Sequence, residues 1–410
     1  MIPELQNPEQ ESTQENSPKQ LIEREVIDQR RPSQKFGDAI AEKFGSQNSK
    51  IKEKAKAIYE RHKDSFDPHI TFDEYLEGFG PKFKHIAKVE TQEIPQQQEE
   101  NNDSPESDPF PPRSPNAQSS TDFFRNFLKA DTNNYNQKGL IGDARDEAIL
   151  HEVANGNLDP ACRAFKKVSI EKNGTKIDFY VMKRPLAVGS GKRNPDGTRD
   201  SVIVPGTPQM AAQMLEYNLM MPTPAMVDAM YQNADVKLSA IPLTPDFHMD
   251  GNGWVLDSNA RIQKQLTEKG GDENNFAVGD KKIKVISNEA FDDRNPRATG
   301  HHEYGFYRAN GTPIQEDSAH GPAISGVRYA DYSSAEQMVK DYVDVTTNGK
   351  TQRVKLTDAI KKPQYAKLLN GSRKENGAPI NYQKAYQMIA KNSKIPAVKQ
   401  AVTKYFSPNV

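Results

Sequence analysis

Three of the seven Asn-Gly dipeptides, those at positions 173–174, 310–311 and 348–349, constrain the fold more than any other feature of this sequence. The first lies in KVSIEKNGTKIDFYVMK, where apolar and polar residues alternate on both sides of the dipeptide. Asn and Gly tolerate the positive φ angles of a type I′ turn, whose twist matches that of two antiparallel strands. The three dipeptides therefore predict three β-hairpins.

Helical patterns occupy separate stretches of the sequence. ARDEAILHEVANG places Ile149, Leu150 and Val153 on one side of a helix that ends at Gly156. TPQMAAQMLEYNLM and TPAMVDAMYQNA both begin with Thr-Pro, which suits an N-cap followed by the first helical residue. We also expect a strand at KKIKVIS and helices from about residue 357 onward. Hairpins with separately grouped helices predict an α+β fold class with a mainly antiparallel sheet.

Composition divides the chain into four segments. Residues 1–35 are polar and almost free of aromatic residues, so we expect a disordered arm. Residues 36–88 contain three short stretches with helical apolar spacing, which predict a small three-helix domain. Residues 89–120 are acidic and rich in Gln and Pro, as in a flexible linker. Residues 121–410 are expected to form the large α+β domain.

Charge and hydropathy narrow the classes of partner. The chain has 55 Lys and Arg against 56 Asp and Glu, so a dominant nucleic-acid-binding surface is not predicted. It contains neither an apolar run of membrane-spanning length nor a basic, apolar start typical of a secretory signal. The cytoplasm is the default location, and export by another route stays open. The single cysteine, Cys162, cannot form an intramolecular disulfide and is expected to be a small buried residue.

Two motifs resemble ligand-binding loops but lack residues that such loops need. GSGK at 189–192 has Leu186 where a phosphate loop requires glycine, and Arg193 where Ser or Thr would bind magnesium. HKDSFDPHITFDEYLEGF resembles a calcium-binding loop in its residue spacing. However, Lys63 takes the first ligand position and Pro68 the position of the turn glycine. We predict neither a metal nor another cofactor.

The segment HHEYGFYRANGTPIQEDSAHGPAISGVRYADYSS is the strongest candidate for a site. His320 could act as a general base with Asp331 orienting its ring, and Arg328 could hold an anionic group. The predicted substrate-binding set is Arg328, Lys281, Tyr329 and Tyr332. The alternative is that the aromatic residues pack the sheet and the histidines lie at the surface. Adjacent His301 and His302 would point to opposite faces of a strand, which opposes a shared metal.

Several motifs in order resemble a largely uncharacterised bacterial protein family over about residues 140–375. They are DARDEAILHEVANGN, MMPTPAMVDAMY, YGFYRANGTPIQ, RYADYS and VKLTDAIKKPQYAKLL. Some members of that family are joined to peptidoglycan-binding modules, so the resemblance implies a role at the cell envelope.

The chain is a histidine-poor variant of that pattern. The family has Gly-His-Lys-Lys at 279–282, Tyr-Gly-Trp-His at 304–307 and Asp-Tyr-Ser-His-Gly at 331–335, and each of these histidines is replaced here. His320, Tyr329 and Asp331 match the pattern. Loss of metal ligands or of a catalytic base generally lowers activity by orders of magnitude, which favours a non-catalytic descendant.

Two functions from different classes therefore stand side by side. The first is a hydrolase-like domain that acts on a cell-envelope polymer through His320 and Asp331. The second is a non-catalytic binding or scaffold protein with a decayed active site, whose N-terminal bundle binds a protein partner. A virion or mobile-element component is a third class, for which the sequence has no specific mark.

Overall fold

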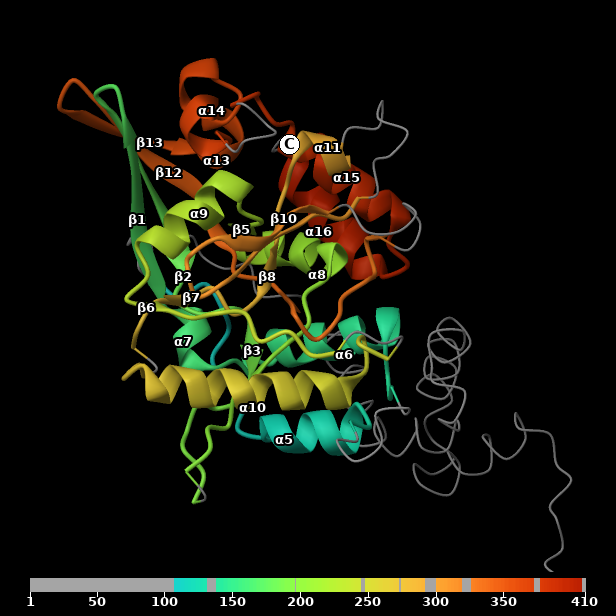
Figure 1. Ribbon diagram of the computed structural model, residues 1–410. Helices are drawn as coiled ribbons and strands as arrows, with labels where there is room; N and C mark the ends of the chain where they lie inside the picture. The colour runs from blue at the N-terminus through green and yellow to red at the C-terminus, as the bar shows by residue number, and fades with distance from the viewer. Residues whose placement is uncertain are drawn as a thin grey trace, which may run out of the picture. The chain divides into compact units, whose positions relative to one another are not determined.

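The computed structural model describes residues 107–130, 138–195, 197–244, 248–272, 274–291, 300–318, 326–371 and 377–407. The predicted arm (1–35), the three-helix domain (36–88) and most of the predicted linker lie outside these ranges. The described residues form an α+β domain with antiparallel sheets, as the sequence predicts (Figure 1).

A five-stranded antiparallel sheet contains two of the three predicted hairpins. Its order is β1-β2-β12-β13, with β5 also paired to β12. Asn173 and Gly174 have φ angles of 52° and 73°, and Asn348 and Gly349 have 51° and 73°, so both turns have the two positive φ angles of type I′. The strands are β1 (Phe165–Lys172), β2 (Thr175–Met182), β5 (Leu219–Met220), β12 (Val339–Thr347) and β13 (Lys350–Lys355).

The third predicted hairpin belongs to a four-stranded sheet of order β10-β9-β8-β11. Its loop is longer than a two-residue turn: Tyr307 pairs with Pro313, and at the Asn-Gly dipeptide only Gly311 has a positive φ angle. Strand β9 is also irregular, because Gly305 and Phe306 have φ angles of 99° and 57°. The strands are β8 (Lys282–Lys284), β9 (Glu303–Tyr307), β10 (Pro313–Ser318) and β11 (Ser334–Ala335), and β8 pairs with β11 in parallel.

Two further strand pairs are short. β3 (Ala187–Val188) pairs with β4 (Val202–Ile203) in an antiparallel manner, and GSGK lies in the loop that joins them. β6 (Val236–Lys237) pairs with β7 (Ala277–Val278) in parallel. The GSGK loop therefore links two strands, whereas a phosphate loop links a strand to a helix.

The helices begin largely where the sequence predicts. Thr207 and Thr223 accept hydrogen bonds from the backbone N–H groups of Met210 and Met226, each at 3.2 Å, which confirms both Thr-Pro caps. The helical elements are α5 (Ser120–Asp122), η2 (Phe123–Phe127), α6 (Gly142–Ala154), α7 (Pro160–Arg163), α8 (Pro208–Gln213), η3 (Met214–Tyr217), α9 (Pro224–Gln232), α10 (Asn252–Glu268), α11 (Asn288–Phe291), α13 (Leu356–Ala359), α14 (Pro363–Leu369), α15 (Tyr382–Asn392) and α16 (Pro396–Phe406). None of those in the described ranges has both the length and the hydropathy needed to cross a bilayer.

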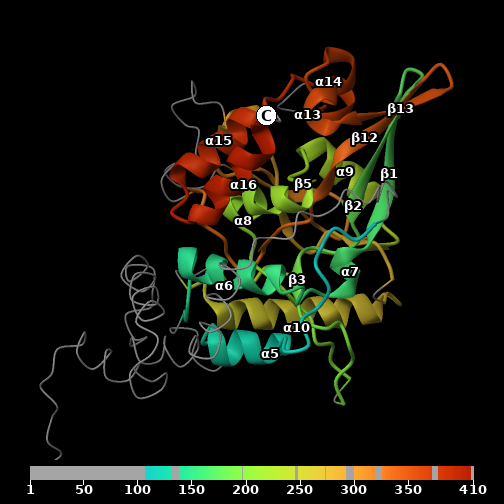
Figure 2. The same ribbon diagram turned by 180° about the vertical axis from the view of Figure 1, so that it is seen from behind.

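Helices cover the five-stranded sheet on one face. Figures 1 and 2 show α9, α13 and α14 beside this sheet, α8 grouped with α15 and α16, and α10 alongside α5. Apolar residues such as Val168, Phe179 and Val343 are fully buried beneath them. Cys162 is also fully buried and its thiol donates to the carbonyl of Asp159 at 3.0 Å, which confirms its expected place in the core.

Residues 107–119, which the sequence assigns to the linker, lie against the domain. The ring of Phe110 is buried, 5.0 Å from the ring of Tyr217. The Arg163 guanidinium donates to the Asp108 carboxylate at 2.6 Å and to the Phe110 carbonyl at 3.0 Å. The packed unit therefore includes this part of the predicted linker.

Candidate functional site

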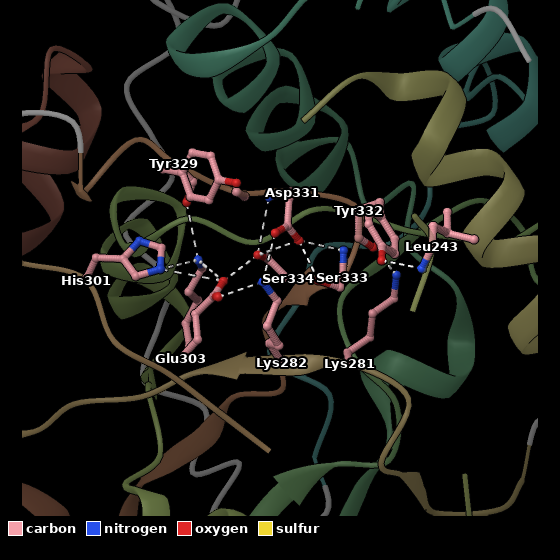
Figure 3. Close-up of polar contacts among 12 residues, drawn as sticks. Leu243, Lys281, Lys282, His301, Glu303, Tyr329, Asp331, Tyr332, Ser333 and Ser334 are labelled. Atoms are coloured by element: carbon pink, nitrogen blue, oxygen red, sulfur yellow. Dashed lines mark hydrogen bonds and ion pairs between the residues drawn. The ribbon is translucent and has the colours of Figure 1, made fainter. Parts of the chain in front are cut away.

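The candidate segment (residues 301–334) contributes to strands β9, β10 and β11 of the four-stranded sheet, and β8 pairs with two of these strands. Alternation along β8 places the side chains of Lys282 and Lys284 on one face and that of Ile283 on the other. Glu303 comes from the neighbouring strand β9, and Ser334 from β11. Figure 3 shows Lys281, Lys282 and Glu303 on one side of a polar network, with Tyr329, Asp331 and Tyr332 on the other.

Glu303 is at the centre of this network. Lys284 Nζ lies 2.6 Å from its Oε1, and Lys282 Nζ lies 2.9 Å from its Oε2. The hydroxyl of Ser334 also donates to Glu303. Lys282 reaches Asp331 Oδ2 at 2.8 Å, and Lys284 lies 3.2 Å from His301 Nε2. We call these six residues (Lys282, Lys284, His301, Glu303, Asp331 and Ser334) the buried network.

Burial and the lysine charges act in opposite directions on the pKa values of the two carboxylates. Burial alone would raise the pKa of Glu303, but Lys282 and Lys284 outweigh it and hold that pKa well below its usual range. The pKa of Asp331 is lowered in the same way by Lys282. Burial, together with the Lys284 charge, lowers the pKa of His301, so its imidazole is neutral near pH 7. The carboxylates are therefore ionised inside the protein because lysines pair with them.

Asp331 is the one predicted catalytic residue in the described ranges, since His320 lies outside them. Its Oδ1 accepts from the backbone N–H of Ser333 at 2.8 Å and from the Ser333 hydroxyl at 2.6 Å. Its Oδ2 accepts from Lys282. Both oxygens of the Asp331 carboxylate are thus bonded to other groups of the domain.

The predicted substrate-binding residues have separate partners. Lys281 is buried, which lowers its pKa to about 8, and it donates to the Ser258 hydroxyl and the Tyr332 carbonyl. Arg328 pairs with Asp143 of α6 at 2.9 Å. The Tyr332 hydroxyl accepts from the backbone N–H of Leu243. Tyr329 is 37% exposed, and its ring centroid lies 6.0 Å from that of His301. Of this set, Tyr329 is the residue that solvent reaches best.

Four buried cations contact the four consecutive residues 329–332. Lys284 donates to the carbonyl of residue 329 and Arg145 to that of residue 330, at 3.2 and 2.9 Å. Lys282 pairs with the side chain at position 331, and Lys281 donates to the carbonyl of residue 332. Sequence reasoning missed Lys282, Lys284, Glu303, Ser334 and Arg145. The available signal was the alternation of lysines in KKIK near an acidic residue in the next strand.

A second group of buried carboxyls lies beside α8. Asp146 accepts from Thr207 and from Gln209, each at 2.7 Å, and burial raises its pKa to about 7. Burial and the nearby Asp146 raise the pKa of Glu336 well above its usual range. These two groups hold protons at pH values where Glu303 and Asp331 are ionised.

The side chains of His301 and His302 have separate partners, as expected for neighbours that point in opposite directions. His301 Nδ1 lies 2.8 Å from the carbonyl of Gly326, while His302 Nδ1 lies 2.5 Å from the Ser287 hydroxyl. Across the described ranges, no three His, Cys, Asp or Glu side chains are placed to hold a metal ion.

An open groove with a volume of about 1090 Å³ lies elsewhere, between η2, the β3–β4 loop and α10. Its lining includes Arg125 from η2, Arg193 and Thr198 from the loop, and Gln263 and Lys264 from α10. Four cationic and four carboxylate side chains line it, so the groove has no large net charge.

Comparison of the chain with protein-family models, curated proteins and solved structures gives no match in any of the three. The resemblance of residues 140–375 to a bacterial family therefore stays a prediction from the motifs. The choice between the two functions expected from the sequence, hydrolase or binding protein, therefore depends on the chemistry of the buried network and of the open groove.

Proposed function

We propose that the described domain binds a polar cell-envelope polymer without cleaving it. The observation that carries this proposal is the engagement of Asp331, whose two carboxylate oxygens accept from Lys282 and from Ser333. A general base must reach the proton that it removes, at about 2.6–3.2 Å or through one water. Asp331 is only 3% exposed, and its contacts are made within the domain.

The rest of the buried network supports the same proposal. Glu303 and Lys284 are fully buried and bonded to each other. For either to act on a substrate, it would have to leave a buried partner of opposite charge, which is strongly unfavourable. The network therefore suits the positioning of the segment at residues 329–334 better than chemistry on a bound polymer.

The groove beside α10 supplies a surface that suits a polymer. Exposed Arg125 and Arg193 can bind carboxylates, and exposed Thr198 and Lys264 can hydrogen-bond hydroxyl and amide groups. Its balanced charges suit a ligand with hydroxyls, amides and a few carboxylates better than a polyanion. A glycan cross-linked by short peptides, as in bacterial sacculi, has this chemistry.

Co-sedimentation of the full chain with purified sacculi tests the proposal. The groove variant is Arg125→Ala combined with Arg193→Ala. Lys172→Ala combined with Lys350→Ala is the control, because it removes the same charge from exposed residues at the tips of the β1–β2 and β12–β13 hairpins. We expect the wild type and the control to sediment, and the groove variant to bind at least tenfold more weakly.

Other outcomes contradict the proposal. If no form of the protein sediments, an envelope ligand is excluded. If the groove variant binds like the wild type, the groove is not the binding site. Soluble fragments found by mass spectrometry in the wild-type supernatant would establish a hydrolase instead.

A hydrolase is the second candidate, because the pKa values of Glu303 and Glu336 are shifted in opposite directions. Pairs of this kind provide the acid and the base in many enzymes. Glu336→Gln tests whether Glu336 is the acid of such a hydrolase. The amide imitates the neutral carboxyl that burial favours but has no acidic proton to donate. Fragment release that persists in Glu336→Gln would remove Glu336 from this role.

A further inference from the structure

The segment at residues 107–113 is held by side chains of the domain. The ammonium of Lys340 donates to the carbonyl of Ser107 at 2.9 Å and lies 4.1 Å from the centroid of the Phe165 ring. The Arg163 guanidinium bonds to both the Asp108 side chain and the Phe110 carbonyl. The Asp108 carboxylate and the carbonyls of Ser107 and Phe110 therefore each have a specific partner, and the Phe110 ring lies against that of Tyr217.

Gly156 lets the segment approach closely. It has a φ angle of 63°, and a Cβ added at this position would lie 2.4 Å from the carbonyl oxygens of Pro111 and Pro112. Gly174 has a similar φ angle of 73°, but a Cβ there would meet nothing within 4 Å. The space above Gly156 is thus shaped to the backbone of the two prolines.

The segment Asp-Pro-Phe-Pro-Pro-Arg has the character of a peptide ligand. Three prolines in five residues restrict the free chain, so it loses little conformational entropy on docking. The segment contributes one fully apolar anchor, Phe110, which is only 6% exposed. An open cavity of about 370 Å³ adjoins it, lined by residues that include Leu158, Pro160 and Arg163.

We propose that Arg163, Lys340, Tyr217 and Gly156 form a peptide-binding site for an acidic, aromatic and proline-rich sequence, occupied in cis by residues 107–113. A tethered ligand has an effective concentration in the millimolar range. The same sequence supplied in trans therefore binds only when the cis copy is weakened. The site holds residues 107–113 on the domain until a competing peptide displaces them.

A labelled peptide of residues 105–115 tests this, with binding followed by fluorescence anisotropy. The acceptor is the full chain with Asp108→Ala and Phe110→Ala. We expect binding to this acceptor to be at least tenfold tighter than to the wild type, and a peptide with Phe110→Ala not to bind. Adding Gly156→Ala to the acceptor should abolish binding, whereas adding Gly174→Ala should not.

Failure to bind a folded acceptor, or equal binding to the acceptor and the wild type, would overturn the proposal. If the acceptor variant does not fold, amide hydrogen exchange of the wild-type chain tests the proposal instead. The amides of residues 107–114 should then exchange faster than those of β2, and faster still with millimolar unlabelled peptide. Exchange at the same rate as β2, with no effect of peptide, would show that the segment opens only with the whole domain.

Discussion

The ammonium of Lys284 lies 2.6 Å from Oε1 of Glu303, and neither side chain has any exposure to solvent. Lys282 contacts the other oxygen of the same carboxylate at 2.9 Å. A buried charge without its partner is far less stable than a buried pair. Folding of this domain therefore depends on bringing β8 and β9 together with their charges matched.

Glu303→Gln should destabilise the domain by about 3–5 kcal/mol, the usual effect of breaking a buried ion pair. The amide is nearly isosteric, so the loss arises from two lysines that lose their carboxylate. Urea denaturation of the full chain, followed by far-UV circular dichroism, measures the change in the free energy of unfolding.

Lys284→Met combined with Glu303→Gln completes a double-mutant cycle. We expect the double variant to be less destabilised than the sum of the single variants, by at least about 1 kcal/mol. Strict additivity would mean that the two side chains do not interact in solution.

Asp146→Asn should change how stability depends on pH. The pKa of Asp146 is about 7 in the folded protein against 3.8 in the unfolded chain. Between these values the folded state binds more protons, so stability falls as pH rises from about 4 to about 7. The shift of about three units corresponds to at most about 4 kcal/mol.

The measurement for Asp146→Asn is the urea midpoint at pH 4, 5, 6, 7 and 8, subtracted from that of the wild type at each pH. The variant should gain stability relative to the wild type across this range. Asp344→Asn is the control, because Arg353 lowers the pKa of Asp344 and confines its effect to pH values below about 4. A difference that does not vary with pH for Asp146→Asn would contradict the expected titration.

Gly279→Ala and Gly349→Ala should differ sharply. Gly349 has a φ angle of 73° and open space around it, so alanine costs about 1 kcal/mol through backbone strain alone. At Gly279, with φ 123°, a Cβ would lie 2.1 Å from the carbonyl oxygen of Leu238, so we expect a loss of at least about 3 kcal/mol. Thermal unfolding of the two variants measures the contrast, and equal losses would refute the close approach.

Cys162 should be inert in the folded protein. Burial raises the pKa of its thiol, and the thiolate is the reactive form. A colorimetric thiol reagent at pH 8 should therefore find no reactive group in the native chain and one in 6 M urea. Rapid reaction without denaturant would show that the thiol is accessible.

Local patterns of the sequence were sufficient to predict the hairpins and the capped helices. Asn173-Gly174 and Asn348-Gly349 form the turns that their φ preferences dictate, because two neighbouring residues decide such a turn. Helix α10 was missed, since its start at Asn252 lies within GNGW and much of the helix that follows is polar. That start is fixed by distant groups: the Asn252 amide donates to the carbonyls of Leu128 and Leu140.

The buried network was beyond sequence reasoning for a related reason. A strand with lysines at alternate positions is typical of a solvent-facing edge, and KKIK fits that pattern. What buries Lys284 is the carboxylate of Glu303, 19 positions away in sequence, together with the segment that covers both. Asp331 was predicted to orient His320, which lies outside the described residues; within them its carboxylate accepts from Lys282 and Ser333.

The contacts of four cations with residues 329–332 have a consequence for folding kinetics. Arg145 comes from α6, and Lys281, Lys282 and Lys284 come from β8 and the residue before it, so the segment docks only after both are in place. A shift of the segment by one residue would break all four contacts at once. Residues 329–332 should therefore dock and detach in one cooperative step rather than residue by residue.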